Sequence, residues 1–594
     1  MKERLQEIGR EAVTELSRLP RLILGLRIVA RLKPDDRHVV YVWAGLMGFL
    51  GACAALLFKA ATEGVKWLFT GHDGGHVETF AQLEPLHRLA VPAVGGLCAG
   101  LVLMLGQRFV RTRATDYMEA LSFGEGHVPV RASLVRSGSA LFSIASGEAI
   151  GREGPLVQLA ALAASTFGRL RRMAPPRRRL LVACGAAAGI ATDYHTPLAG
   201  ALFVAEIVLG SLAIETLGPL LLASVVAVLT VQGIEGNEAL YRFEGFALNS
   251  PWEIGLYALL GVLCGPAAHL WMRLLRRVRS AFGALPAAPW ARLTLGGLLV
   301  GLLALSRPEV VGNGGGLIRG LLDGAYAWPL LLLLLGLKVA ASAAAFGSGA
   351  VGGVFTPSLF VGAAGGFLFA TVASTAFPGL DPGGYALAGM GGFIAAATRA
   401  PITAILMIFE MTLQYSLVPP LIAATVCAHV AARSLGVESL YGESLASAPQ
   451  TVFDRDLADV DVAALMRPEP RRVALEEQLA EIASAFLRAP ARELWVVEAS
   501  GRFRGVVLLE DVQPQLASPE LAGLVIAGDL LREDCPRLRS DQALPEALMA
   551  FTGSGYENLP VVAEGSGELV GALGRADLML ALSELARREV ARIA

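Results

Sequence analysis

Long apolar segments most limit how this chain can fold. They recur from residue 39 to about residue 435, and several approach the roughly 20 residues that a helix needs to cross a bilayer. Examples are 39–60, 88–105, 254–272 and 328–345. The chain is 54% hydrophobic and only 17% charged, whereas soluble domains average roughly 25% charged residues. We therefore predict a polytopic α-helical membrane protein that contacts lipid.

Other apolar segments are short and are interrupted by glycine or proline. Examples are 133–150, 151–168 and 349–377. Non-helical backbone at membrane depth is tolerated only where it lines a cavity or is buried within protein. We therefore expect many tilted and broken helices, some of which end inside the membrane.

The ends of the membrane region predict its orientation. Residues 1–36 mix charged and apolar residues from the start, which favours a cytoplasmic amphipathic helix at the interface and no signal peptide. The Arg-rich stretches 169–179 and 271–279 are typical of cytoplasmic ends. We assign 37–447 to the transmembrane domain and expect both termini to be cytoplasmic.

Two pairs of motifs indicate an internal duplication. Pro197–Glu206 (PLAGALFVAE) resembles Pro401–Glu410 (PITAILMIFE), and Gly151–Pro155 (GREGP) resembles Gly353–Pro357 (GVFTP). In each pair, the second motif follows the first after nearly the same number of residues. The repeats would span about 39–235 and 253–435. Sequence alone does not say whether the repeats are inverted.

The composition changes after Ser447. In 451–594, short β-branched runs alternate with amphipathic helical patterns. Strands are expected at 494–497, 505–511, 559–562 and 571–577, and each copy has a Gly followed six positions later by an Asp. We predict a soluble α/β repeat with copies at about 460–515 and 528–584.

The Gly151–Pro155 segment carries the clearest chemistry. Glycine lets backbone approach a ligand closely. A helix that starts after Pro155 would present unpaired N–H groups and the positive end of its dipole, which attract an anion without a full positive charge. Conduction needs binding that is favourable but weak. Gly353–Pro357 offers the same arrangement from the other half.

Glu153 is unusual in such a segment. An ionised carboxylate at an anion-attracting helix terminus competes with the anion, whereas a protonated one can swing away. An ionisable side chain inside the membrane is functional by default. Glu153 is therefore predicted to be a proton-sensitive gate, the alternative being a helix-capping Glu paired with Arg152.

These motifs resemble those of the CLC chloride channel and transporter family over about 40–445. Gly151–Pro155 and Gly353–Pro357 look like its GREGP and GxFxP signatures, and 124–131 is similar to the ClcB-like bacterial branch. The resemblance implies the CLC inverted-repeat fold, a homodimer with one pore per subunit, and a bacterial inner membrane. The ligand would be chloride.

The resemblance also implies the site residues. Glu153 falls on the gating glutamate, with Arg152 and Gly154 beside it at the anion. Val354 and Phe355 fall where backbone amides touch the anion, and Tyr441 falls on a late tyrosine whose hydroxyl contacts it.

The segment 124–129 departs from the family's GSGIP motif. Alignment on Pro129 puts Gly126 in the place of the serine, and alignment on Gly124 puts Glu125 there. A carboxylate facing the anion would repel it, so we place the Gly126 backbone at the site and expect Glu125 to turn away.

A second departure concerns proton coupling. Family exchangers carry two adjacent glutamates after the PLAG-like segment, and the second relays protons from the cytosol. Here Glu206 is followed by Ile207, so the relay position is apolar. This favours a glutamate-gated channel, responsive to pH and voltage, over a proton-coupled antiporter. Glu206 and Glu410 occupy echoing positions and are expected to be structural.

The C-terminal repeat resembles a CBS domain pair. Asp511 and Asp577 fall where nucleotide-binding members hold ribose, whereas the preceding hydroxyl position is Leu508 in one copy and Gly574 in the other. A dimerisation and stability module is therefore favoured over adenine-nucleotide binding, and no cofactor is expected.

Other functional classes fit less well. The sequence contains no HExxH or GxSxG motif, so we do not expect an enzyme. Acidic residues are too scattered for a divalent-cation channel, and the six cysteines form no CxxC pair, so no metal site is expected. A net charge of −2 does not favour nucleic-acid binding. A fluoride-type exporter remains a minor alternative.

Overall fold

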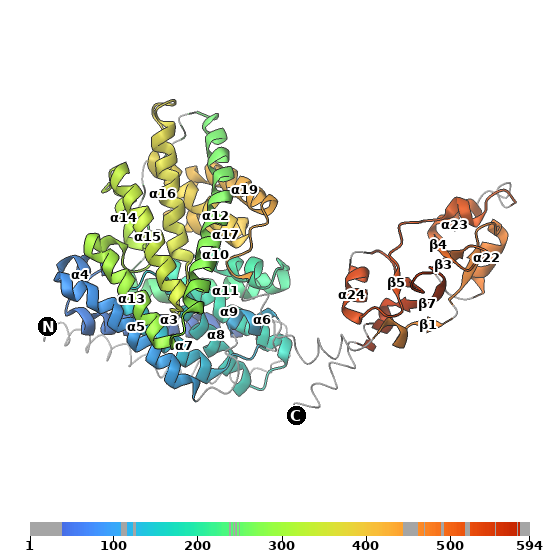
Figure 1. The fold of residues 1–594 in the computed structure, drawn as a ribbon, viewed down its shortest axis with the longest axis horizontal. Coiled ribbons are helices and arrows are strands. Elements are labelled where there is room, and N and C mark those ends of the chain that lie inside the picture. The colour runs from blue at the N-terminus through green and yellow to red at the C-terminus, as the bar shows by residue number, and fades with distance from the viewer. Residues whose placement is uncertain are drawn as a thin grey trace. The chain divides into compact units, whose positions relative to one another are not determined.

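The structure is a computed structural model of the chain. It describes residues 39–581 apart from 109–115, 123–125, 237–238, 242, 244–245, 247, 249, 443–460, 469, 489–491, 517–522, 553 and 579. The amphipathic helix predicted for 1–36 therefore lies outside the described residues. The chain forms two compact units that divide after Ser447, where the composition changes. Figure 1 shows a helical unit and a smaller α/β unit.

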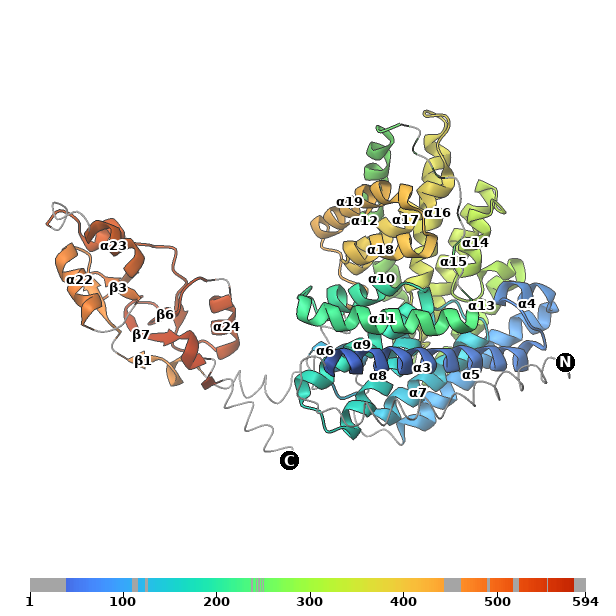
Figure 2. The ribbon, with the colours of Figure 1, turned by 180° about the vertical axis from the view of Figure 1, so that it is seen from behind.

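The first half of the helical unit contains ten helical segments, counted over the described residues. They are α3 (Val39–Thr70), α4 (His76–Gln82), α5 (Pro85–Gln107), α6 (Tyr117–Ser122), α7 (Val130–Ala145), α8 (Glu153–Leu170), α9 (Pro175–Tyr194), α10 (Pro197–Leu202), the π-helical η1 (Phe203–Val208) and α11 (Ile214–Glu235). Helices α3, α8, α9 and α11 lie side by side (Figure 2).

The second half repeats this plan. Its helices are α12 (Glu253–Ala284), α13 (Pro289–Ser306), η2 (Pro308–Val310), α14 (Gly315–Leu322), α15 (Trp328–Ser348), α16 (Phe355–Ala373), α17 (Pro382–Thr398), α18 (Pro401–Thr412), η3 (Tyr415–Leu417) and α19 (Val418–Ser434). Helices α12, α16, α17 and α19 pack together, as their counterparts do in the first half.

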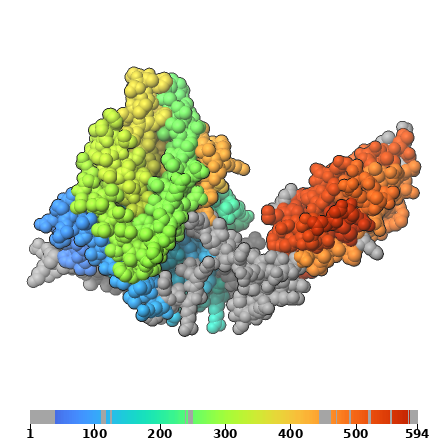
Figure 3. Space-filling model, viewed as in Figure 1, coloured from blue at the N-terminus to red at the C-terminus, as the bar shows by residue number. Residues whose placement is uncertain are grey.

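Eight helical segments within the described residues are long and apolar enough to cross a membrane. They include the four long segments that the sequence predicts. In the space-filling view, α12 to α16 make up most of the face turned to the viewer (Figure 3). These helices expose apolar side chains, among them Leu263, Leu270, Leu302 and Leu332. Such side chains suit contact with lipid, and the protein is a multi-pass membrane protein.

Proline sets where many of these helices begin. It occupies the first turn of α5, α9, α10, α13, α15, α17 and α18, where its missing N–H would be unpaired in any case. The same reason corrects one prediction. Helix α8 begins at Glu153, not after Pro155, because proline is tolerated in the first turn. Helix α16 likewise begins at Phe355, ahead of Pro357.

Glycine lets the first and last helices of each repeat approach closely. A Cβ on Gly48 of α3 would lie 2.3 Å from the Ala223 carbonyl oxygen of α11. A Cβ on Gly261 of α12 would lie 2.2 Å from the Ala424 carbonyl oxygen of α19. Real Cβ atoms essentially never approach within 3.0 Å, so both contacts require glycine. The same contact in both halves supports the duplication.

The two repeats are joined by reciprocal helix caps. Glu206 accepts hydrogen bonds from Thr403 N at 2.8 Å and Ile402 N at 3.3 Å, at the start of α18. Glu410 accepts from Leu198 N at 2.9 Å and Ala199 N at 2.8 Å, at the start of α10. Each carboxylate thus satisfies unpaired N–H groups of the other repeat. This agrees with the structural role expected for both glutamates.

The α/β unit contains one four-stranded and one three-stranded sheet. The strands are β1 (Arg467–Pro468), β2 (Arg472–Ala474), β3 (Glu493–Val497), β4 (Phe503–Leu508), β5 (Leu538–Arg539), β6 (Asn558–Val562) and β7 (Leu569–Gly574). The sheet orders are β1-β7-β6-β5 and β2-β3-β4. The helical segments are η4 (Val462–Ala464), α22 (Leu479–Leu487), α23 (Leu509–Leu516), η6 (Ala527–Leu530) and α24 (Leu544–Thr552).

The two copies exchange edge segments. Strand β1, at the start of the first copy, pairs antiparallel with β7 of the second, and Arg532, near the start of the second copy, bridges to Val506 of the first. The predicted strands at 505–511 and 571–577 are too long, because β4 ends at Leu508 and β7 at Gly574. Asp511 instead lies in the first turn of α23, where acidic side chains are favoured.

Candidate anion pathway

The two signature segments meet at the centre of the helical unit. Gly151 N donates to Gly353 O at 2.6 Å, and Gly353 N donates to Gly151 O at 2.9 Å, which forms a short antiparallel bridge. Helices α8 and α16 begin two residues after these glycines. Both helix N-termini, with their unpaired N–H groups and positive dipole ends, therefore start from the same place.

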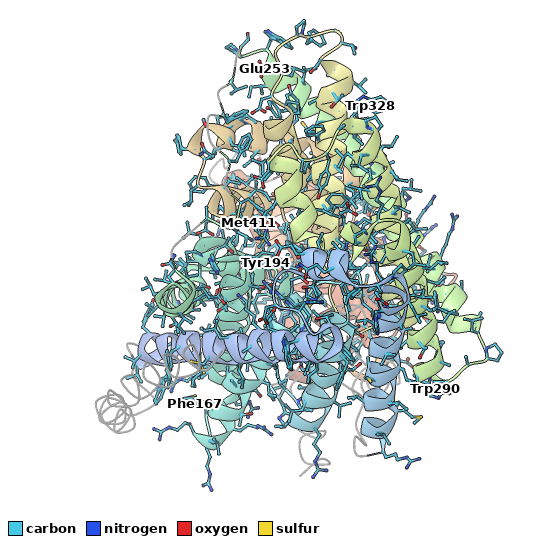
Figure 4. The ribbon with its side chains drawn as sticks, turned by 90° about the vertical axis from the view of Figure 1, so that its left-hand side faces the viewer. Phe167, Tyr194, Glu253, Trp290, Trp328 and Met411 are labelled. Carbon is cyan, nitrogen blue, oxygen red and sulfur yellow. The ribbon has the colours of Figure 1, made fainter. Side chains whose placement is uncertain are left out.

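The Glu153 carboxylate lies between these termini. The residue is 4% exposed, and its Oε1 accepts hydrogen bonds from the Tyr194 hydroxyl at 2.5 Å, from Thr356 N at 3.1 Å and from the Thr356 hydroxyl. Figure 4 shows Tyr194 near the middle of the unit. Thr356 N belongs to the first turn of α16. The carboxylate thus occupies donors that would otherwise be open to an anion.

Glycine at 151 and 353 makes room for this carboxylate. A Cβ on Gly151 would lie 1.9 Å from Glu153 Oε2, and a Cβ on Gly353 would lie 2.6 Å from the same atom. No larger side chain fits at either position while Glu153 is in place. Oε2 has no hydrogen-bond partner among the described residues.

A cavity lies on each side of Glu153. The first, which we call the Tyr441 cavity, has a volume of about 300 Å³ and is lined by residues that include Gly154, Val354 and Tyr441. The second, the Arg152 cavity, has a volume of about 540 Å³ and is lined by residues that include Arg152, Tyr194 and Thr356. The chain neighbours of Glu153 thus divide between the two cavities, Gly154 lining one and Arg152 the other.

Four aromatic rings run from one cavity to the other. The Tyr194 and Phe355 ring centroids are 5.5 Å apart, those of Phe355 and Phe203 6.1 Å, and those of Phe203 and Tyr441 5.4 Å. Edge-on and tilted contacts at these distances are favourable. The rings form a rigid apolar wall whose two ends carry the Tyr194 and Tyr441 hydroxyls.

The structure brings most of the predicted site residues together. Gly154, Val354 and Tyr441 line one cavity, and Phe355 lies in the aromatic wall. Arg152 lines the other cavity, but its Nε donates to Asp193 Oδ1 at 2.7 Å rather than to Glu153. Its charge is therefore largely balanced by Asp193.

Gly126 is the exception, because the structure places it away from the Tyr441 cavity. Its carbonyl accepts a hydrogen bond from the Ser165 hydroxyl at 2.8 Å, and a Cβ there would lie 2.9 Å from Arg179 N. It is not among the described residues that line the Tyr441 cavity. The prediction rested on alignment of Pro129 with the family's GSGIP motif, whereas in the structure Gly126 packs closely against α9. Glu125 lies outside the described residues.

Asp116 and Tyr117 take the place expected for Gly126. Both line the Tyr441 cavity at the start of α6. Tyr117 N donates to Asp116 Oδ1 at 2.7 Å and to Gln158 Oε1 at 2.9 Å. Protein oxygens thus already satisfy this N–H. An acidic residue directly before a short helix is a capping signal that sequence reasoning missed here.

Tyr194 and Thr356 were also missed. Thr356 lies inside the GVFTP segment and Tyr194 lies just before the PLAG-like segment, so both adjoin recognised motifs. Nothing in the sequence indicates that their hydroxyls meet, since they are separated by 162 residues.

Ile207 is buried in η1. Both carboxylate oxygens of its neighbour Glu206 are bound at the start of α18. Neither residue, as placed, offers a titratable group to Glu153.

The two aspartates of the α/β unit are both paired with arginine. Asp511 Oδ1 accepts from Arg532 at 2.6 Å, and Asp577 Oδ1 accepts from Arg467 at 2.8 Å. Hydrogen bonding to Asp511 raises the pKa of Arg532. The two arginines hold equivalent places, because each lies on the edge segment that one copy contributes to the other. They occupy one carboxylate oxygen of each aspartate, while the Oδ2 atoms of both aspartates have no hydrogen-bond partner among the described residues.

Comparisons with known proteins agree with this arrangement. A family model for voltage gated chloride channels matches residues 104–433, and one for the CBS domain matches 527–584. A ClcB-like chloride channel protein of Ralstonia nicotianae is 47% identical over 410 residues, covering 68% of this chain and 96% of that protein. A voltage-gated ClC-type chloride channel ClcB of Escherichia coli is 42% identical over 414 residues, covering 68% and 98%.

A solved structure is also similar. The X-ray structure of a slow cyanobacterial Cl⁻/H⁺ antiporter superposes with a TM-score of 0.62 at 25% sequence identity. It covers 71% of this chain and 100% of the antiporter chain.

Proposed function

Because this chain belongs to the voltage gated chloride channel (CLC) family, we propose that it conducts chloride between the two cavities and that Glu153 is the gate. The observation that carries this proposal is the position of the buried Glu153 carboxylate. Its chain neighbours line the two cavities, and it accepts a hydrogen bond from Thr356 N in the first turn of α16. Ionised, it occupies the donors at that helix terminus. Protonated, it loses its negative charge and can leave them.

Chloride would then accept the same hydrogen bonds. The N-terminal N–H groups of α8 and α16 attract an anion through partial charges. The Arg152 guanidinium is tied to Asp193 and adds little net charge. Binding is therefore weak enough for the ion to leave again, as conduction requires. The Tyr441 hydroxyl would contact the ion on the other side of the gate.

We favour a channel over a proton-coupled antiporter. An antiporter must bring protons to Glu153 from the side of the Tyr441 cavity. Ile207 has no proton to exchange, and the Glu206 oxygens are engaged with α18. The antiporter is kept as the second candidate, because the similar cyanobacterial protein is described as one. A fluoride-type exporter is a minor third.

The test is purified protein in liposomes, with chloride and proton fluxes measured together. A channel reverses at the chloride equilibrium potential at every pH gradient, whereas an antiporter's reversal potential shifts with the pH gradient. Uphill proton movement driven by chloride would refute the channel. Potassium flux above chloride flux would refute anion transport, and fluoride flux far above chloride flux would favour the exporter. Glu153→Gln should remove most of the pH dependence of chloride flux.

We further propose a homodimer with both termini in the bacterial cytoplasm and no bound cofactor. Helices α10, α11, α18 and α19 expose apolar side chains that a second copy could cover, among them Leu198, Leu229, Ile402 and Val430. The CBS pair would act without nucleotide, because Leu508 and Gly574 stand where nucleotide-binding members carry a hydroxyl side chain, and arginine already binds one oxygen of each aspartate. Cross-linking in membranes and calorimetry with ATP or AMP test these two points.

A further inference from the structure

We propose that the Tyr194 and Thr356 hydroxyls form a latch that holds the ionised Glu153 carboxylate in the closed position and thereby sets the pH at which the gate opens. This inference rests on the proposed function and adds two positioning residues to it. Neither residue contacts the anion while the gate is closed. They act through Glu153.

The latch consists of three donors on one carboxylate oxygen. The Tyr194 hydroxyl lies 2.5 Å from Glu153 Oε1 and 2.9 Å from the Thr356 hydroxyl, which also contacts Oε1. Thr356 N is the third donor, at 3.1 Å. A carboxylate only accepts hydrogen bonds, so this arrangement favours the ionised form over the protonated one.

The two hydroxyls are held in place by separate repeats. Tyr194 is the last residue of α9, where His195 turns the chain with a φ of 58°. Its ring packs on Phe355. Thr356 lies in the first turn of α16, and the Gly151–Gly353 bridge joins the two segments. Since neither donor can easily follow the carboxylate, withdrawal of Glu153 breaks these hydrogen bonds.

Several charged and titratable groups surround Glu153. Arg152 and Asp193 form an ion pair at 2.7 Å and largely cancel. The neighbouring tyrosines are neutral over the ordinary pH range. Other ionisable side chains line the two cavities: Glu63, His76, Glu78, Arg319 and Asp323 in the Arg152 cavity, and Asp116, Arg136, Arg276, Arg279 and Glu438 in the Tyr441 cavity. The Glu153→Gln variant distinguishes titration of Glu153 from titration of these groups. The groups that interact electrostatically with Glu153 are Arg152, Asp193, Tyr194, Tyr117, Tyr241 and Tyr441.

Loss of one latch hydroxyl should make the gate easier to protonate. One hydrogen bond to a charged group changes the protonation equilibrium by roughly ten- to a hundredfold. Tyr194→Phe keeps the ring and its packing but removes the donor. Chloride flux is expected to rise as Glu153 becomes protonated. The pH midpoint of this rise should therefore move up by about one to two pH units in the variant.

The experiment measures chloride efflux from liposomes as a function of pH for the full-length protein. The variants are Tyr194→Phe, Thr356→Val, Glu153→Gln and the double variant Glu153→Gln with Tyr194→Phe. Tyr385→Phe is the matched control. Its hydroxyl is buried without a hydrogen-bond partner among the described residues, and its ring stacks on Tyr257 at 4.0 Å, away from Glu153.

We expect a raised midpoint in Tyr194→Phe and Thr356→Val, a wild-type midpoint in Tyr385→Phe, and flat profiles in both variants that lack the Glu153 carboxylate. If Tyr194→Phe keeps the wild-type midpoint while Glu153→Gln gives a flat pH profile, the latch is overturned and the proposed gate stands. If Tyr194→Phe does not fold, Thr356→Val decides in the same way. A pH-dependent Glu153→Gln profile would overturn the proposed gate and the latch with it.

Discussion

Substitution of Gly151 by alanine tests whether the carboxylate position controls the gate. A Cβ at Gly151 would lie 1.9 Å from Glu153 Oε2, whereas real Cβ atoms essentially never approach closer than 3.0 Å. The carboxylate must therefore move by about 1 Å or more, which stretches hydrogen bonds beyond their useful range. Helix α8 itself can stay in place, because the clash involves the end of a flexible side chain.

The expected magnitude follows from the hydrogen bonds that this movement breaks. The bond from Tyr194 at 2.5 Å and the bond from Thr356 N at 3.1 Å both end on the displaced carboxylate. A hydrogen bond to a charged group contributes roughly 1.5–3 kcal/mol. The loss of even one raises the pH midpoint of chloride flux by about one to two units, since one unit corresponds to about 1.4 kcal/mol.

The assay is chloride efflux from liposomes between acid and mildly alkaline pH. Gly365→Ala is the matched control, because a Cβ at Gly365 of α16 meets nothing within 4 Å. Gly151→Ala should conduct chloride at a pH at which the wild type and Gly365→Ala are closed. A wild-type pH profile in folded Gly151→Ala protein would refute the reasoning, since the carboxylate would then not be held where the structure places it.

Four further outcomes are expected. Tyr441→Phe should weaken chloride binding roughly tenfold or more through the loss of one donor, and unchanged affinity by calorimetry would contradict a role as ligand. Deletion of 451–594 should leave chloride flux in the remaining unit, and a folded but inactive truncation would contradict the modular view. Glu410→Gln should lower thermal stability in detergent because it weakens the cap on α10, and an unchanged melting temperature would count against that cap. Cys535 should resist maleimide at pH 8 until the protein is denatured, because burial raises its pKa to about 12 and keeps the thiol protonated; rapid labelling of the native protein would show that it is accessible.

Local patterns account for the elements that were predicted correctly. The length and composition of apolar runs indicate which helices can cross a membrane. The duplication was visible because each motif repeats its own local order. Glu153 stays a predicted gate, suggested because a carboxylate among glycines at a helix start is chemically unusual. The strand ends at Leu508 and Gly574 were misplaced, since β-branched runs do not show where a following helix takes over.

The membrane class, the two repeats and the α/β module follow from residues that are neighbours along the chain, and so does the prediction that Glu153 is the gate. The packed structure was needed to show that Glu206 and Glu410 cap each other's repeat and that Asp116 and Tyr117 rather than Gly126 line the cavity. It alone brought Tyr194 and Thr356 together across 162 residues. Such contacts depend on how helices pack, and packing is set by all surfaces at once.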